Sequence, residues 1–253
     1  MYLPFSDLKG FRVVGREVGA ADEPVALGTL DDLRVDVRDW RVGHLVLATG
    51  GPLAPRRVLL GTDRPVAFDL VRRELVTEWT PYDVDTAPEA SSLRTAADAA
   101  EDDPDGEGGL MFGPGGSGGP GASTGDDGPA VLGGDPAAVS VPPTEEERHL
   151  HDARELLGYA IGGSDGEVGT VSDLLIDRES PAIAWLVVAT GSWLSGRDVV
   201  LDPAWTTDAS AAGRRMSVAL TRERMREAPP LESLDGLDHA YGAALAVFYR
   251  FVG

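Results

Sequence analysis

An internal repeat is the strongest constraint that this sequence places on its fold. Gly28-Thr-Leu-Asp-Asp-Leu-Arg-Val-Asp36 returns 141 residues later as Gly169-Thr-Val-Ser-Asp-Leu-Leu-Ile-Asp177. Roughly 14 of the 33 positions from 28 to 60 are identical to their partners at this offset, without a gap. The repeat predicts two copies of one small domain. Each copy has about 80 structured residues, near the lower limit for a self-sufficient hydrophobic core.

Short apolar runs within each copy predict β-strands. In the second copy, residues 170–176 and 183–189 are rich in Val, Ile and Leu, and a polar turn containing Pro181 separates them. Asp165-Gly is typical of a tight hairpin. Strands about 8–12 residues apart, with Gly, Pro and Asp between them, predict a small antiparallel barrel or sandwich.

Four segments follow from these patterns. The two copies occupy residues 1–84 and 148–228, and each opens with a short helical turn, over 6–10 and 153–158. Residues 85–147 are acidic and rich in Gly and Pro, and they have too few apolar side chains to offset the entropy of ordering. We expect a long disordered linker there, which leaves the copies free to move unless they dock directly.

Residues 229–253 predict a C-terminal amphipathic helical tail. Its apolar residues recur at the spacing of one helical face. They are Leu237, Tyr241, Ala244, Leu245 and Phe248.

Composition excludes several classes of function. The formal net charge of −20 repels phosphate backbones, so direct nucleic-acid binding is not expected. The chain has no cysteine, which excludes disulfides and thiolate metal sites and fits a reducing compartment. No apolar run is long enough to span a membrane, and the first residues do not resemble a secretory signal. We therefore expect a cytoplasmic protein without a membrane span.

Several motifs of the second copy together resemble one known family. They are Leu157-Gly-Tyr, Asp165-Gly-Glu-Val-Gly, the run from Val171 to Asp177, and Leu186-Val-Val-Ala-Thr-Gly-Ser-Trp-Leu. These segments are similar to the PRC-barrel domain, which is named after the cytoplasmic domain of the photosynthetic reaction-centre H subunit. The first copy departs further from this pattern. The resemblance implies an all-β fold with a six-stranded antiparallel β-barrel in each copy.

The resemblance also implies a function. PRC-barrel domains mostly serve as docking modules, so it implies a non-catalytic protein–protein adaptor or assembly module with a protein partner. Two alternatives stay open: a soluble accessory of reaction-centre electron transfer or assembly, and a factor in ribosome maturation or RNA metabolism that acts through a protein partner. A homodimer formed through the barrel or the tail helix is a further alternative.

Aromatic side chains of the second copy and the tail are the candidate interface residues. Exposed tryptophans are frequent anchors of protein interfaces. The alternative is that these rings pack on the barrel or under the tail helix. The candidates are Trp185, Trp193, Trp205, Tyr241 and Phe248.

No catalytic, cofactor or metal site is predicted. Residues 113–118 spell G-x-G-x-x-G, but no strand precedes them and no helix follows, as a dinucleotide site requires. His149 and His151 would share one face of an extended strand, yet two ligands fall short of the four that a structural metal site uses. His44 and His239 are isolated in the sequence.

Two aspartates recur in both copies: Asp32 and Asp36 return as Asp173 and Asp177. Carboxylates four residues apart on a strand are roughly 13 Å apart, too far for a catalytic pair. We interpret them as turn-capping or barrel-rim residues, with a shared cation or a proton relay as the alternative.

Overall fold

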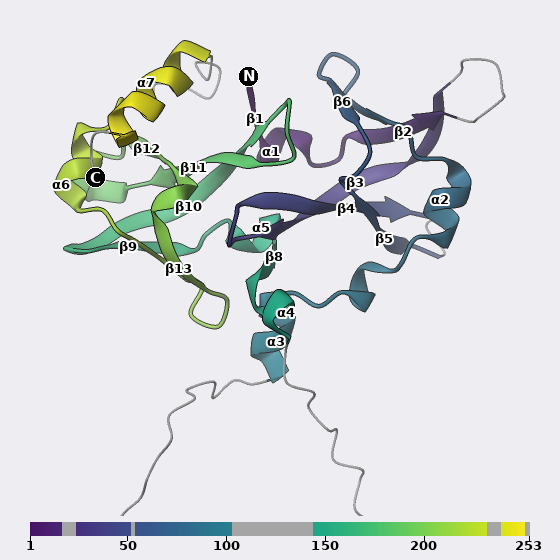
Figure 1. The fold of residues 1–253 in the computed structure, drawn as a ribbon, viewed down its shortest axis with the longest axis horizontal. Helices are drawn as coiled ribbons and strands as arrows, with labels where there is room; N and C mark the ends of the chain where they lie inside the picture. The colour runs from purple at the N-terminus through teal and green to yellow at the C-terminus, as the bar shows by residue number, and fades with distance from the viewer. Residues whose placement is uncertain (17–23, 52–53, 103–143, 232–238, 251–253) are drawn as a thin grey trace, which may run out of the picture.

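The computed structural model describes residues 1–16, 24–51, 54–102, 144–231 and 239–250. The fold is mostly β, in two halves that are each built on a seven-stranded sheet and carry short helices (Figure 1). One sheet lies to one side of the molecule and the other sheet to the other side. The tail helix α7 covers the second half.

Six strands of the first half form a sheet in the order β5-β4-β3-β2-β7-β6. Neighbouring strands are antiparallel except β2 and β7, which run parallel. The strands are β2 (Arg12–Arg16), β3 (Pro24–Asp36), β4 (Arg41–Thr49), β5 (Arg56–Gly61), β6 (Val66–Asp69) and β7 (Glu74–Thr77).

The second half repeats this arrangement in the order β12-β11-β10-β9-β14-β13, again with one parallel pair, β9 and β14. Its strands are β9 (Ala160–Gly163), β10 (Gly166–Asp177), β11 (Ile183–Ala189), β12 (Asp198–Leu201), β13 (Thr206–Ser210) and β14 (Arg215–Val218).

The sheets differ from the expected barrels in two respects. Each half has the six strands expected, but a purely antiparallel sheet was the wrong prediction, because β7 and β14 return beside β2 and β9 through a hairpin. Closed barrels are not seen either. Within the described residues, the end strands β5 and β6 do not pair with each other, and neither do β12 and β13.

Short helices border the sheets. They are α1 (Phe5–Leu8), α2 (Pro81–Thr86), η1 (Ala90–Ser92), α3 (Ala96–Asp102), α4 (Glu145–His149), α5 (Ala153–Leu156), η2 (Gly191–Leu194), η3 (Pro203–Trp205), α6 (Arg222–Glu227) and α7 (His239–Arg250). Thr221 caps α6, because its side chain accepts a hydrogen bond from the Arg224 N–H. None of the described helices has the length and apolarity needed to cross a bilayer.

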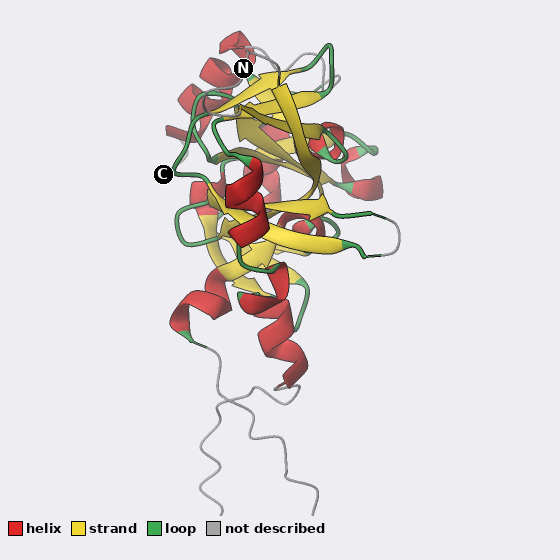
Figure 2. Ribbon diagram, turned by 90° about the vertical axis from the view of Figure 1, so that its right-hand side faces the viewer, coloured by secondary structure: helices red, strands yellow, loops and turns green. Residues whose placement is uncertain are grey.

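Both ends of the predicted linker, 85–147, are structured. The Leu59 N–H of β5 donates to the Pro88 carbonyl, and Ala90 is buried against Val46 and Leu59, so this segment covers the edge of the first sheet. Helices α3 and α4 lie side by side where the chain leaves and re-enters the described part (Figures 1 and 2). Residues 103–143, which include the G-x-G-x-x-G segment, lie outside the described residues.

The seventh strand of each sheet comes from the opposite half. Strand β1 (Tyr2–Pro4) pairs with β10, and β8 (Leu150–Asp152) pairs with β3. The registers are equivalent, since Leu3 faces Ile176 as His151 faces Val35. Figure 1 shows the purple N-terminal strand lying with the green strands of the second half.

A local two-fold relation organises the centre of the molecule. The Val42 N–H donates to the Pro181 carbonyl at 2.8 Å, and the Ile183 N–H donates to the Trp40 carbonyl at 2.8 Å. These bonds are related by the same offset of 141 residues, and they flank a β-bridge between Arg41 and Ala182. One hydrophobic core cluster extends through both halves. The two copies are therefore docked on each other through their backbones.

Candidate binding sites at the junction of the halves

The recurring aspartates Asp32 and Asp173 each bind a helix of the opposite half. Asp173 Oδ2 accepts from the Ser6 hydroxyl at 2.5 Å, and Oδ1 accepts from the Ser6 N–H at 3.2 Å. Asp32 Oδ1 accepts from the Arg154 N–H at 3.1 Å. Ser6 and Arg154 lie in the first turns of α1 and α5, whose amides have no partner within the helix. Both aspartates are buried, and burial raises the pKa of Asp32 against the opposing effect of the Leu33 and Arg154 N–H groups.

The other recurring pair, Asp36 and Asp177, caps turns as expected. Asp36 Oδ1 accepts from the Arg38 N–H at 2.9 Å, and Asp177 Oδ1 accepts from the Glu179 N–H at 2.8 Å. The four aspartates therefore have two roles: one pair stabilises local turns, and the other joins the halves. Sequence reasoning missed the second role because the capped helices begin more than 120 residues away.

Each sheet receives one strand from the opposite half, which we call a strand exchange. A buried ion pair lies at the exchange where β8 pairs with β3. Arg34 Nε lies 3.0 Å from Asp152 Oδ1, and Arg34 Nη2 donates to the Ala90 carbonyl at 3.1 Å. Burial raises the pKa of Asp152 to about 6, against the opposing charge of Arg34. Burial, helped by Asp152, also raises the pKa of the neighbouring Glu155 to about 7.

The other strand exchange is apolar at the equivalent place. Pro4 faces Leu175 there, as Asp152 faces Arg34. Backbone pairing is thus the same at the two exchanges, while the side-chain chemistry differs.

The histidines lie in different elements of the fold. His149 ends α4, and its Nε2 lies 3.1 Å from Glu145 Oε1. His151 lies in β8, fully buried, with Nδ1 3.4 Å from the Tyr159 hydroxyl, and burial lowers its pKa to about 4. His44 lies in β4, and His239 begins α7. Within the described residues, no group of three or more His, Asp or Glu side chains is arranged to hold a metal ion.

The five candidate interface aromatics lie in or beside the core of the second half. Trp185 is only 6% exposed, and its ring lies between Tyr2 and Tyr249, with centroids 6.1 and 6.4 Å away. Its side chain is therefore covered by β1 and α7. The other four are half-buried and pack against the core: Trp193, Trp205, Tyr241 and Phe248.

Trp193 carries a distinctive set of neighbours. Its indole N–H donates to the Val168 carbonyl, which fixes the ring. The guanidinium carbons of Arg222 and Arg226 lie 4.6 and 5.9 Å from the ring centroid. Arg197 joins them, because its Nη2 donates to the Arg226 carbonyl at 2.9 Å. We call these four residues the Trp193 patch.

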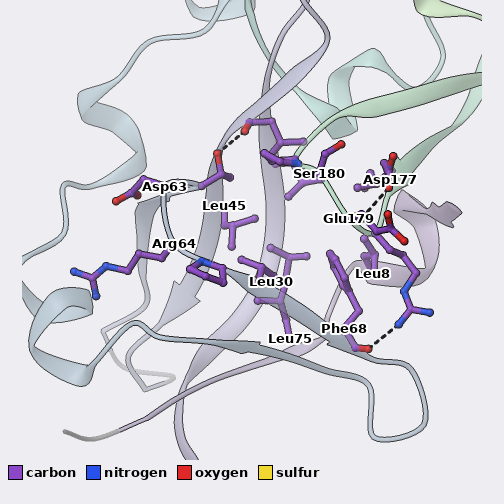
Figure 3. A pocket seen from close by; sticks show the side chains of 18 residues that line it. Leu8, Leu30, Leu45, Asp63, Arg64, Phe68, Leu75, Asp177, Glu179 and Ser180 are labelled. Atoms are coloured by element: carbon purple, nitrogen blue, oxygen red, sulfur yellow. Dashed lines mark hydrogen bonds between the residues drawn. The ribbon is translucent and has the colours of Figure 1, made fainter. Parts of the chain in front are cut away.

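A cavity of about 310 Å³ lies in the first half, beneath the turn between β10 and β11 (Figure 3). Leucines from α1, β3, β4 and β7 line its interior: Leu8, Leu30, Leu33, Leu45 and Leu75. Its rim comes from residues 62–66 of the first half and 177–181 of the second. The sequence did not predict this cavity, since the two segments of its rim are more than 100 residues apart in the chain.

The comparison with known families identifies one domain. Residues 149–224, from the end of α4 into α6, match the family described as the PRC-barrel domain. No curated protein matches the chain.

Proposed function

We propose that this chain, whose residues 149–224 match the PRC-barrel domain, is a non-catalytic adaptor or assembly module that binds a protein partner. The observation that carries the proposal is that the buried ionisable side chains bond across the junction of the two halves. Asp32, Asp173 and the Arg34–Asp152 pair all bond from one half to the other. Buried charges placed in this way unite two domains into one body on which a partner can dock.

The proposal treats residues 1–84 as a divergent second PRC-barrel copy. Both halves share the strand order, the single parallel pair and the helix before the first sheet strand. They also share the donated strand and the capping aspartate. Repeated use of one architecture with different surfaces is what a scaffold needs, because each half can then present its own contacts.

We place the partner surface on the Trp193 patch, and we infer a partner segment rich in Asp and Glu. Trp and Arg are the residue types most enriched among interface hot spots. Two arginines lie over one half-buried indole here, and a third binds the backbone of one of them, on a chain whose net charge is −20. A local positive surface on an acidic protein selects a partner of complementary charge.

Affinity capture from the source cells with the full chain, followed by titration of the purified partner, tests this proposal. The charge reversal Arg222→Glu/Arg226→Glu should weaken binding by about tenfold or more. The matched control Arg72→Glu/Arg215→Glu makes the same change at exposed positions away from the patch and should leave affinity within about twofold.

Two outcomes would count against the proposal: capture of no specific partner, or equal loss of affinity in both charge-reversed variants. The identity of a captured protein also separates the alternatives, because a reaction-centre component and a ribosomal protein point to different processes.

A further inference from the structure

The cavity of the first half has the size and lining of a small-molecule site. Its volume of about 310 Å³ is near the lower end of the roughly 300–1,000 Å³ seen for ligand pockets. Its interior leucines are at most 5% exposed, so they form a closely packed apolar floor beneath the rim. A half-open, mostly apolar space of this size suits a compact ligand better than a peptide.

Differences between the two copies at the rim account for the position of the cavity. At the offset of 141, Arg64 of the first half is equivalent to Trp205, and Pro181 is equivalent to Trp40. Trp40 belongs to the buried core, and Trp205 packs against it. The equivalent rim on the other side of the junction therefore has two indoles, Trp205 from the second half and Trp40 from the first, at places where the rim of the cavity has none.

Arg64 is held away from the cavity by its own partners. Its Nη1 lies 3.0 Å from Asp83 Oδ2 and 3.3 Å from the Glu78 carbonyl, and its guanidinium lies 4.0 Å from the Trp79 ring. Figure 3 shows its side chain directed away from the leucines. These contacts hold the Arg64 side chain out of the entrance of the cavity. The opening therefore depends on side chains of the first half.

The rim carries an excess of carboxylates. Asp63, Asp177 and Glu179 line it together with Arg64 and Arg178. The charge of Arg64 is balanced by Asp83, and Arg178 donates to the Phe68 carbonyl at 3.2 Å. Figure 3 shows Asp177 and Glu179 on one side, Asp63 on the other, and Leu30, Leu45 and Leu75 between them.

We propose that this cavity binds a small amphipathic cation, an alkyl- or arylammonium compound whose apolar body lies among the leucines and whose head meets the rim carboxylates. Apolar burial supplies the affinity, and the rim charge selects the head group. Because residues 177–181 belong to the second half, the bound ligand contacts both halves and stabilises their pairing. This inference does not depend on the partner proposed for the Trp193 patch.

Three probes with the same apolar body and different heads test the proposal: n-hexylammonium, 1-hexanol and hexanoate, titrated into the full chain by calorimetry. Hexylammonium should bind about threefold to tenfold more tightly than hexanol, and hexanoate most weakly, because the rim favours positive charge. Hexylammonium should also raise the midpoint of thermal unfolding, since it binds the folded state.

Variants locate the binding. Leu75→Phe fills the cavity and should weaken hexylammonium by about tenfold or more, provided that its thermal unfolding remains cooperative. Val66→Phe, at the half-buried rim, narrows the entrance without enlarging the core and serves if Leu75→Phe does not fold. Glu179→Gln should weaken hexylammonium by about threefold and leave hexanol unchanged, whereas Glu223→Gln on α6 should change neither.

Three results would overturn the proposal. They are an absence of saturable binding of all three probes, hexanol binding as tightly as hexylammonium, and unchanged binding in whichever cavity-filling variant folds.

Discussion

Asp173 accepts hydrogen bonds from both the hydroxyl and the backbone N–H of Ser6, which lies 167 residues away in the other half. The equivalent aspartate, Asp32, accepts from the Arg154 N–H in the reverse direction. Each half therefore supplies the cap for a helix that it does not contain. This reciprocity makes the junction part of the fold of both halves.

Asp173→Ala should lower the free energy of unfolding by about 1–3 kcal/mol, because it removes the cap of α1 together with both hydrogen bonds that Asp173 accepts from Ser6. Urea denaturation followed by circular dichroism measures the change. Asp208→Ala, on the exposed face of β13, is the control and should shift stability by less than about 0.5 kcal/mol. Equal effects of the two substitutions would show that the contact between the halves contributes nothing.

Asp152→Ala should destabilise the chain by about 3–5 kcal/mol, because it leaves the Arg34 guanidinium buried without its counter-ion. Arg34→Leu/Asp152→Ala approximates the apolar pair Leu175 and Pro4 of the other exchange, so it should recover much of that loss. A double-mutant cycle by chemical denaturation isolates the coupling. If the double variant is the least stable member of the cycle, the ion pair is not the source of the effect.

The ion pair should also determine which halves associate. Two first halves would place Pro4 beside Arg34, and two second halves would place Asp152 beside Leu175, so each self-pair buries an unpaired charge. Separate fragments 1–102 and 144–253, once mixed, should therefore form a one-to-one complex in preference to either homodimer.

Analytical ultracentrifugation of the separate and mixed fragments tests this selectivity. Fragment 1–102 carrying Arg34→Leu should self-associate more strongly than its parent, since its self-pair no longer buries a guanidinium. Preferential homodimers of the parent fragments would contradict the prediction and would favour the homodimer that the sequence left open.

Glu155 predicts a dependence of stability on pH. Burial, together with Asp152 and Asp98, raises its pKa to about 7 from an ordinary value near 4.5, so the folded chain holds a proton that the unfolded chain releases. Its contribution to stability is full below about pH 4.5 and is lost as the pH rises through about 7. His151, whose pKa is lowered to about 4, acts in the opposite direction up to about pH 6.5.

Comparison with Glu155→Gln separates the two effects. The glutamine variant should gain stability relative to the parent chain as the pH rises from about 5 to about 8, as measured by denaturation across that range. Glu223→Gln supplies the control. A difference between Glu155→Gln and the parent that does not change with pH would mean that Glu155 titrates normally.

Local patterns predicted much of this structure. The strand pair over 170–189 and the turn aspartates Asp36 and Asp177 depend on residues that are close in sequence, and the repeat carried each prediction from one copy to the other. The predicted boundaries of the linker were wrong where apolar residues are sparse. Ala90, for example, is buried in a segment whose composition predicted disorder.

The junction could not be predicted, for a physical reason. Strands β1 and β8 have three residues each, too few to show alternation, and their partners lie in the opposite copy. The same holds for the cavity, whose rim joins residues 62–66 to 177–181. Contacts between the two copies produce no local sequence pattern, because the same strands could equally have paired within their own copy.

Because β3 pairs with β8 of the second half, the first sheet can be completed only after residues 150–152 have been synthesised. When residue 102 has left the ribosome, β3 still lacks β8, and at roughly 5–20 residues per second the missing strand follows about 2–10 seconds later. During that interval the backbone of residues 34–36 is an unpaired sheet edge, and a second nascent chain on the same messenger could pair with it. The length of the segment between the halves therefore sets a waiting time, so shortening it should favour cis pairing over entanglement of neighbouring nascent chains.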